Sequence, residues 1–99
     1  MLNAALLSTS DSFEYITATG YGSGYAHKQK DICTLAKESA NGLLACPPGV
    51  KEFERYFIDQ NDNRLQNGKE CTCTGKTVTG SEKNYYECET KAKARCERR

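Results

Sequence analysis

The 99-residue chain lacks tryptophan and has only one histidine, one methionine, two prolines and three phenylalanines. Hydrophobic residues make up 37% of it, so it can bury only a small core, and a chain of this length forms a single domain. No hydrophobic run is long enough to span a membrane. The net charge of +1 argues against a strongly basic nucleic-acid-binding protein. The catalytic inventory is equally thin, because no GxSxG elbow is present and His27 is the sole histidine.

The chain does, however, contain six cysteines. An even number of cysteines in a short polar chain predicts a disulfide framework, and disulfides persist in secreted or periplasmic compartments. The sequence has no CxxC pair, which argues against structural zinc, a thioredoxin-type centre and c-type haem attachment. We therefore expect three disulfides, no cofactor, no metal and a secreted or periplasmic protein. The six residues are Cys33, Cys46, Cys71, Cys73, Cys88 and Cys96.

Residues 1–12 differ in character from the rest of the chain. The run Leu2–Leu7 is apolar, but no basic region precedes it and it is too short for a signal peptide. We expect no signal peptide in this sequence, and an N-terminal arm that is mobile or docks on a neighbouring copy. Residues 13–99 are expected to form a single disulfide-stabilised α+β domain.

The first part of that domain predicts a strand followed by a helix. Residues 13–21 are rich in β-formers and predict the strand. Three glycines at alternate positions, 20, 22 and 24, share one face of an extended chain, where a helix can approach closely. Residues 25–44 predict an amphipathic helix that ends at Pro47 and Pro48. Its apolar stripe comprises Ile32, Leu35, Ala36, Ala40 and Leu43.

The segment 50–58 has an ambiguous pattern. Val50, Phe53 and Phe57 suit a short helix, whereas Phe53, Arg55 and Phe57 suit a strand. We favour the short helix or turn.

The last third of the chain predicts a hairpin, with strands over 70–78 and 84–96 and a turn over 79–83. A turn centred on Gly80 and Ser81 places Cys73 directly opposite Cys88, so the remaining bridges should tie the hairpin to the helix and its exit. The second strand alternates, and four small or sulfur-bearing residues in a row on its inner face leave room for a helix to lie close. That face comprises Tyr86, Cys88, Thr90, Ala92, Ala94 and Cys96. The expected fold is therefore α+β: one amphipathic helix on a small antiparallel sheet, in the order β-α-(short helix or loop)-β-β.

Between the segment 50–58 and the hairpin lies a loop dense in Asn and Asp. Its oxygen-bearing residues have a spacing that looks like an EF-hand calcium loop: Asp59, Asn61, Asn63 and Glu70. It departs from that pattern because Arg64 stands where the sharp bend needs glycine, and because no helix enters the loop. We favour a solvated, turn-rich loop and keep calcium as the alternative.

A basic stripe and several tyrosines are the candidate contact residues. The stripe occupies the outer face of the last strand, where it either stays solvated and discourages aggregation or contacts an acidic partner. Tyrosines provide rigid amphipathic contact area, which is enriched at binding interfaces. The candidate surface residues are Tyr21, Tyr25, Tyr85, Lys91, Lys93 and Arg95.

These features favour a small extracytoplasmic, disulfide-rich binding module without enzymatic activity, such as an inhibitor, an effector or an envelope component. We expect a protein partner and no nucleic-acid partner. One alternative is a structural subunit of a surface or filament assembly that self-associates through the N-terminal arm. The other is a small secreted ribonuclease that uses His27 near Glu38 or Glu54.

Overall fold

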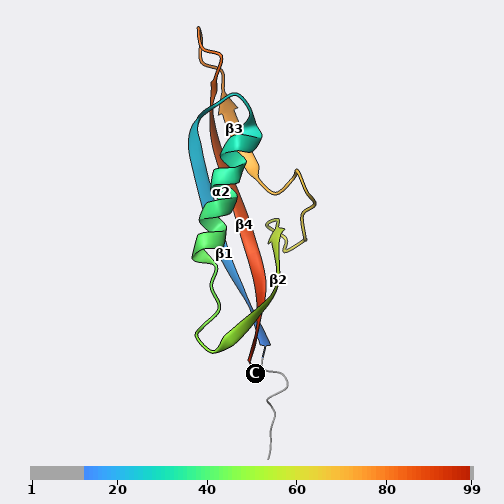
Figure 1. Ribbon diagram of the computed structural model, residues 1–99. Helices are drawn as coiled ribbons and strands as arrows, with labels where there is room; N and C mark the ends of the chain where they lie inside the picture. The colour runs from blue at the N-terminus through green and yellow to red at the C-terminus, as the bar shows by residue number, and fades with distance from the viewer. Residues whose placement is uncertain (1–12, 99) are drawn as a thin grey trace, which may run out of the picture.

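The computed structural model describes residues 13–98, which form four strands and one helix (Figure 1). Their order is β1 (Phe13–Ala26), α2 (Gln29–Leu43), β2 (Val50–Ile58), β3 (Thr72–Lys76) and β4 (Asn84–Arg98). All four strands belong to one antiparallel sheet. The expected α+β fold, with one helix on a small antiparallel sheet, is confirmed. The expected N-terminal arm, 1–12, lies outside the described residues.

β4 is the strand on which the sheet is built. On one side it pairs with β1 from Asn84 to Glu97. On the other side it pairs first with β3 and then with β2, and the change of partner falls at Thr90. The Thr90 hydroxyl donates a hydrogen bond to the carbonyl oxygen of Glu70, in the loop that leads into β3. β4 therefore contacts every other strand of the sheet.

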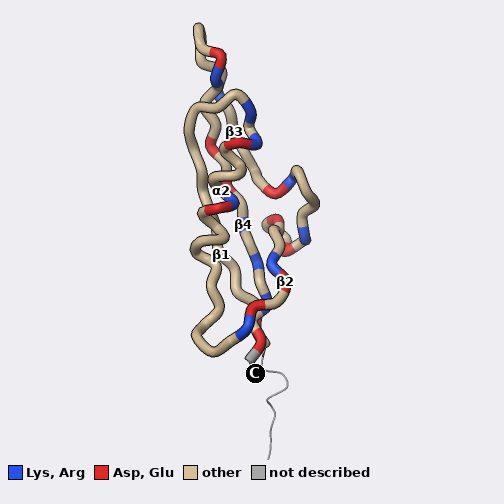
Figure 2. Tube along the Cα trace, viewed as in Figure 1, with Lys and Arg blue, Asp and Glu red and all other residues tan. Residues whose placement is uncertain are grey.

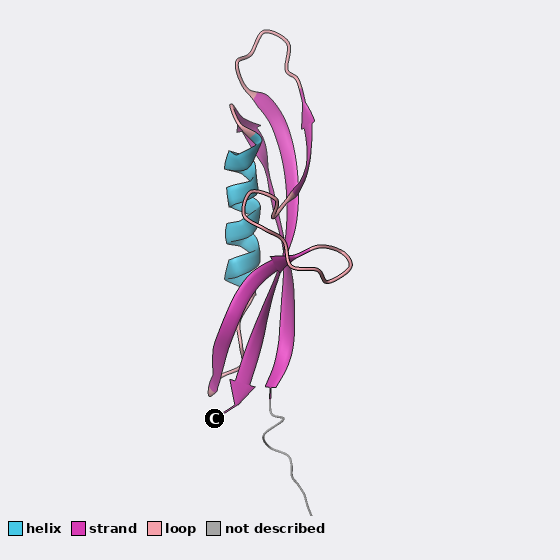
Figure 3. Ribbon diagram, turned by 90° about the vertical axis from the view of Figure 1, so that its right-hand side faces the viewer, coloured by secondary structure: helices cyan, strands magenta, loops and turns pink. Residues whose placement is uncertain are grey.

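The helix covers one face of this sheet, and no helix in the described part of the chain covers the other (Figure 3). The covered face is lined by small side chains, because Ala92 and Ala94 of β4 are fully buried beneath the helix. On β1 the helix comes closer still. A Cβ added to Gly22 would lie 2.7 Å from the carbonyl oxygen of Ile32, and one added to Gly20 would overlap the backbone of the helix. The two glycines thus permit a backbone-to-backbone contact that no other residue would allow.

Three disulfides fasten the helix and its exit to the sheet. Cys33 of the helix bonds to Cys71, and Cys46, which follows the helix, bonds to Cys96 of β4. Cys73 bonds to Cys88, its register partner across β3 and β4. The expected opposition of Cys73 and Cys88 is confirmed, as is the attachment of the hairpin to the helix.

The expectation of a short helix or turn over 50–58 is wrong, because this segment is strand β2. A bulge at Glu54 explains the misleading pattern. Glu54 has a positive φ of 51° and stands outside the pairing register, so the alternation of side chains restarts after it. Phe53 and Phe57 therefore lie on opposite faces although their spacing suggests one side of a helix.

The bulge also positions a residue that interacts with the C-terminal end of the helix. It directs the Arg55 guanidinium toward the end of α2, where it donates hydrogen bonds to the carbonyl oxygens of Asn41 and Leu44 at 3.1 and 3.0 Å. The last turn of α2 contains no basic residue of its own. Arg55 supplies from a neighbouring strand the positive charge that favours a helix C-terminus.

The other boundaries shift by a few residues. β1 continues through the glycines to Ala26, beyond the expected end at residue 21, and α2 begins at Gln29 instead of residue 25. β3 is shorter than the expected strand, and β4 is two residues longer. No helix in the described part of the chain is long and apolar enough to cross a membrane.

Replacing Gly20 or Gly22 by alanine is expected to destabilise the protein by about 1–3 kcal/mol, because the new methyl group must push the helix off β1. Gly42→Ala is the matched control. Gly42 lies in the helix with no atom near its missing Cβ, so alanine should be neutral or stabilising by up to about 1 kcal/mol. Urea unfolding of the three variants measures these differences. Equal effects at Gly22 and Gly42 would contradict the close contact.

Tryptic digestion of the unreduced protein is expected to give two disulfide-linked species. One joins the peptides 31–37, 70–76 and 84–91, and the other joins 38–51 to 96–98, because these peptides carry the three bonded pairs. Mass spectrometry before and after reduction identifies them. In the double variant Cys33→Ser/Cys71→Ser, peptide 31–37 should be released while 70–76 stays joined to 84–91. A bond between peptides 38–51 and 70–76 would show a different connectivity.

Candidate functional site

The face of the sheet opposite the helix is the candidate functional surface. Side chains alternate along each strand, so the residues of β1 and β4 that do not face the helix share this side. We call it the outer face. On β1 it comprises Phe13, Tyr15, Thr17, Thr19, Tyr21, Ser23 and Tyr25; on β4 it comprises Tyr85, Glu87, Glu89, Lys91, Lys93, Arg95 and Glu97.

All six candidate contact residues from the sequence lie on this face. Tyr25 and Tyr85 are register partners, and their rings meet edge to face with centroids 5.1 Å apart. Tyr21 and Tyr25 are 66% and 63% exposed, far more than tyrosines in a packed interior. Phe13 and Tyr15 are also about half exposed and extend the aromatic row to the other end of β1. The outer face therefore carries a row of exposed rings along one strand.

The cations of β4 are held among these rings and neighbouring carboxylates. The Lys93 ammonium lies 4.6 Å from the centre of the Tyr15 ring and 2.8 Å from the Asp62 carboxylate. The Arg95 guanidinium contacts the Glu97 carboxylate at 2.8 Å and lies 5.9 Å from the centre of the Phe13 ring. These cations are fixed by their neighbours, so this end of the face presents aromatic and aliphatic surface more than free positive charge.

The opposite end of the face is a shallow groove of about 480 Å³ that crosses β1, β4 and β3. Glu87 and Glu89 of β4 lie in it beside Tyr21, Ser23, Thr72 and Thr74. The Glu89 carboxylate is near enough to the Tyr21 hydroxyl to raise the pKa of that tyrosine, because it interacts favourably with the protonated hydroxyl and its negative charge opposes ionisation. The two ends of the outer face thus differ in charge: glutamates line the groove and cations lie at the other end.

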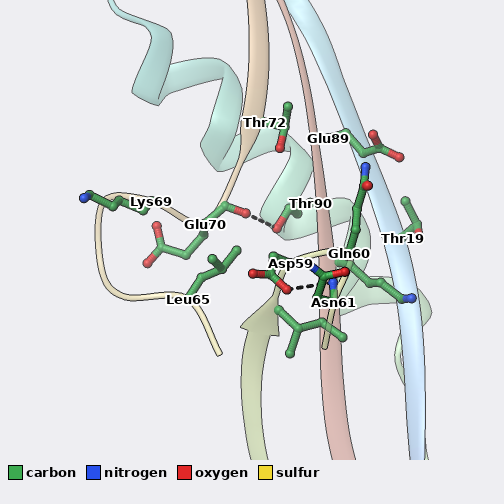
Figure 4. A pocket seen from close by; sticks show the side chains of 12 residues that line it. Thr19, Asp59, Gln60, Asn61, Leu65, Lys69, Glu70, Thr72, Glu89 and Thr90 are labelled. Atoms are coloured by element: carbon green, nitrogen blue, oxygen red, sulfur yellow. Dashed lines mark hydrogen bonds between the residues drawn. The ribbon is translucent and has the colours of Figure 1, made fainter. Parts of the chain in front are cut away.

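The calcium-like loop satisfies its oxygen atoms internally. One Asp59 carboxylate oxygen accepts a hydrogen bond from the amide of Asn61 at 2.8 Å (Figure 4) and another from the amide of Asn63 at 2.9 Å. These bonds stabilise the ionised form, and they hold the pKa of Asp59 below its ordinary value. Asp59 thereby shapes its own turn, as an Asx residue commonly does.

Glu70, the last of the candidate calcium ligands, interacts with the Gly68 amide and the Lys37 ammonium. Its side chain is nine-tenths buried, accepts a hydrogen bond from the Gly68 amide at 3.0 Å and lies 3.6 Å from the Lys37 ammonium. It lines, with Asp59, a polar cavity of about 610 Å³ at the junction of β2 and β3 (Figure 4). Among residues 13–98, no group of three or more His, Cys, Asp or Glu side chains is arranged to hold a metal ion.

His27 follows β1 directly and is exposed at the start of the connection to the helix. Its neighbour Ala26 pairs with Asn84, whereas the Glu54 bulge lies opposite Arg95, eleven residues further along β4. At about 3.3 Å per residue, roughly 35 Å of strand separates these two positions. The structure therefore does not bring His27 and Glu54 together, and Glu38 lies in the third turn of the helix.

Sequence reasoning missed four aromatic residues that border the candidate surface. Phe13 and Tyr15 are separated from Tyr21 and Tyr25 by even numbers of residues, so all four lie on one side of a continuous strand. This spacing could have identified Phe13 and Tyr15 from the sequence. Phe53 and Tyr56 of β2 were hidden by the bulge. The Arg64 guanidinium stacks 4.3 Å from the centre of the Tyr56 ring, so the loop after β2 flanks this margin of the face.

Comparison with known proteins gives no relative to draw on, since the chain matches no family model, no curated protein and no solved structure.

Replacing Glu89 by Gln is expected to lower the pKa of Tyr21, because the carboxylate that opposes its ionisation is lost. The Tyr21 ring resonances followed by NMR against pH measure this shift. Glu82→Gln removes a carboxylate in the exposed hairpin turn and should leave Tyr21 unchanged. An unchanged Tyr21 titration in Glu89→Gln would mean that the two side chains do not interact in solution.

Proposed function

We propose that the protein is a small extracytoplasmic binding module that uses its outer face to contact a protein partner and has no enzymatic role. The exposed aromatic row of β1 carries this proposal. Phe13, Tyr15, Tyr21 and Tyr25 alternate with the residues of β1 that face the helix, so they stand on the opposite side of the sheet, and all four are exposed. Rings held on a strand present large contact area at little cost in side-chain entropy, which is why aromatic residues are enriched at interfaces.

The disulfides support the location. Three bonds in a domain of this size fit an oxidising compartment, because cytosolic thiols are kept reduced. They also support the binding role, since a sheet whose shape is held covalently can present its face without a large core behind it.

The lack of a catalytic constellation among the described residues supports a non-enzymatic role. The sole histidine is exposed and far from Glu54, and Asp59 and Glu70 of the polar cavity accept hydrogen bonds from their own loop. A general base needs a partner group within hydrogen-bond reach, and His27 has no side-chain hydrogen bond or ion pair in the described part of the chain.

A photo-crosslinking amino acid tests the proposal. The full chain, secreted from its own host, carries benzoylphenylalanine at Tyr21 on the outer face or at Glu38 on the exposed side of the helix. Irradiation is expected to give discrete protein adducts from position 21 and none from position 38. Adducts from position 38 alone, or the same adducts from both positions, would contradict the assignment of the outer face as the binding surface.

A further inference from the structure

One edge of β1 has no strand beside it. Among residues 13–98, β1 pairs with β4 alone, and no backbone hydrogen bond reaches its other side. The loop after β2 lies on the outer face, where Asp62 bonds to Lys93 and Gln60 lines one cavity with Thr19. This loop keeps a partner from packing flat on the middle of the outer face, but β1 can still be reached from the side.

β1 also lacks the features that protect the edges of sheets. Of its 14 residues only Glu14 is charged and none is proline, and its pairing with β4 has no bulge (Figure 2). β2, by contrast, has four charged residues and a bulge, and the bridge from Ile58 to Arg64 occupies part of its free side. β3 has only five residues. Because charges, bulges and short length discourage pairing at a sheet edge, β1 is the unprotected edge among the described strands.

The helix overhangs this edge with apolar side chains. Cys33 stands on the flank of α2 that faces β3, since it bonds to Cys71 just before that strand. Leu35 is two residues further, about 200° around the helix, so it stands on the opposite flank, above the free edge of β1. Leu43 follows after two steps of four residues, which keep to one flank of a helix. The two leucines are 46% and 67% exposed.

The helix argues against a second copy of β1 as the occupant of this edge. Gly20 and Gly22 bring the backbone of α2 directly over β1. Neighbouring strands lie about 4.8 Å apart, so two copies paired antiparallel through β1 would hold their helices at about that separation. Packed helices need about 8–10 Å between their axes. The edge therefore favours a strand that has no helix above it.

We propose that the partner adds an extended segment of its own as a strand along the free edge of β1. The segment is uncharged, to match a strand whose only charge is Glu14. Its alternate side chains on the helix side are apolar, because they lie beneath Leu35 and Leu43, and the others lie beside the exposed rings of the outer face. Main-chain hydrogen bonds give such a complex its affinity, and the alternate side chains give its specificity. This inference rests on the proposed function, because it states how the partner reaches the same row of rings.

Displayed peptides test the proposal. A library of random peptides of about ten residues, long enough to span most of β1, is selected on the native chain. The recovered peptides are expected to be uncharged, to have apolar residues at alternate positions and to lack proline at their centres, because proline cannot donate a main-chain hydrogen bond. A selection that recovers no peptide, or only charged ones, would overturn the inference.

N-methylation of a recovered peptide distinguishes strand addition from other modes of binding. Successive amides of a strand point to opposite sides, so only one alternate set can face β1. Methylating that set should weaken binding by about tenfold or more, whereas methylating the other set should leave the affinity nearly unchanged. Amide exchange followed by NMR locates the peptide, because the β1 amides that face away from β4 should become protected when it binds. Equal effects of the two sets, or protection confined to β2 and β3, would contradict strand addition at β1.

Substitutions on the helix test the overhang. Leu35→Glu and Leu43→Glu should each weaken binding of the peptide by about tenfold, because each replaces an apolar contact by a charge. Thr34→Glu is the matched control, since it adds the same charge at an exposed position on the side of the helix away from the sheet. Circular dichroism checks that the three variants keep their fold. Unchanged affinity in both leucine variants would contradict a segment beneath this flank.

The two proposals fail differently. If the methylated sets act alike while position 21 still crosslinks to another protein, the outer face binds by another route and only strand addition is refuted. If the β1 edge becomes protected in the native chain alone as its concentration rises, a second copy is the occupant and the inference is wrong. If a peptide pairs with β1 but position 21 gives no adduct in the host, the edge is a binding site and the outer face is not.

Discussion

The close contact between the helix and β1 is the constraint on which the rest of the structure depends. Gly20 and Gly22 let the two backbones approach, and the helix then lies so near the sheet that β4 must offer alanines beneath it. A layer this thin has little room for large apolar side chains, and Cys96 is the largest fully buried side chain in the described residues. The disulfides occupy the space and provide the stability that a thicker core would give.

The sequence allowed much of this architecture to be predicted because its signals are periodic. Glycines at every second position, small residues alternating along β4 and a turn that aligns Cys73 with Cys88 each follow from the geometry of an extended chain. β2 escaped prediction because one inserted residue, Glu54, resets the alternation, and no local signal marks a bulge at a residue that is not glycine.

Individual residues of the candidate surface could be predicted from the sequence, but their arrangement relative to one another could not. Tyr21 and Lys91 could each be placed on an outward side of their strand, yet only the register of β1 against β4 shows that these sides coincide. In the loop after β2, the sequence pattern suggested a site that the structure does not form. Its oxygen atoms have the spacing of metal ligands, but an aspartate that accepts hydrogen bonds from the next amides gives the same spacing in an ordinary turn.

The central place of β4 has a consequence for how the molecule assembles. Phe13 pairs with Glu97, so the first and last described strands meet across nearly the whole described chain, and β2 and β3 pair only with β4. Such non-local pairing makes folding slow, because the entropy of closing long loops is lost before any strand contact compensates for it. Until β4 is in place, Cys46 and Cys73 have no native partners. Oxidation of Cys46 or Cys73 before β4 arrives therefore joins the wrong cysteines, and native yield depends on thiol–disulfide exchange in the compartment where the chain folds.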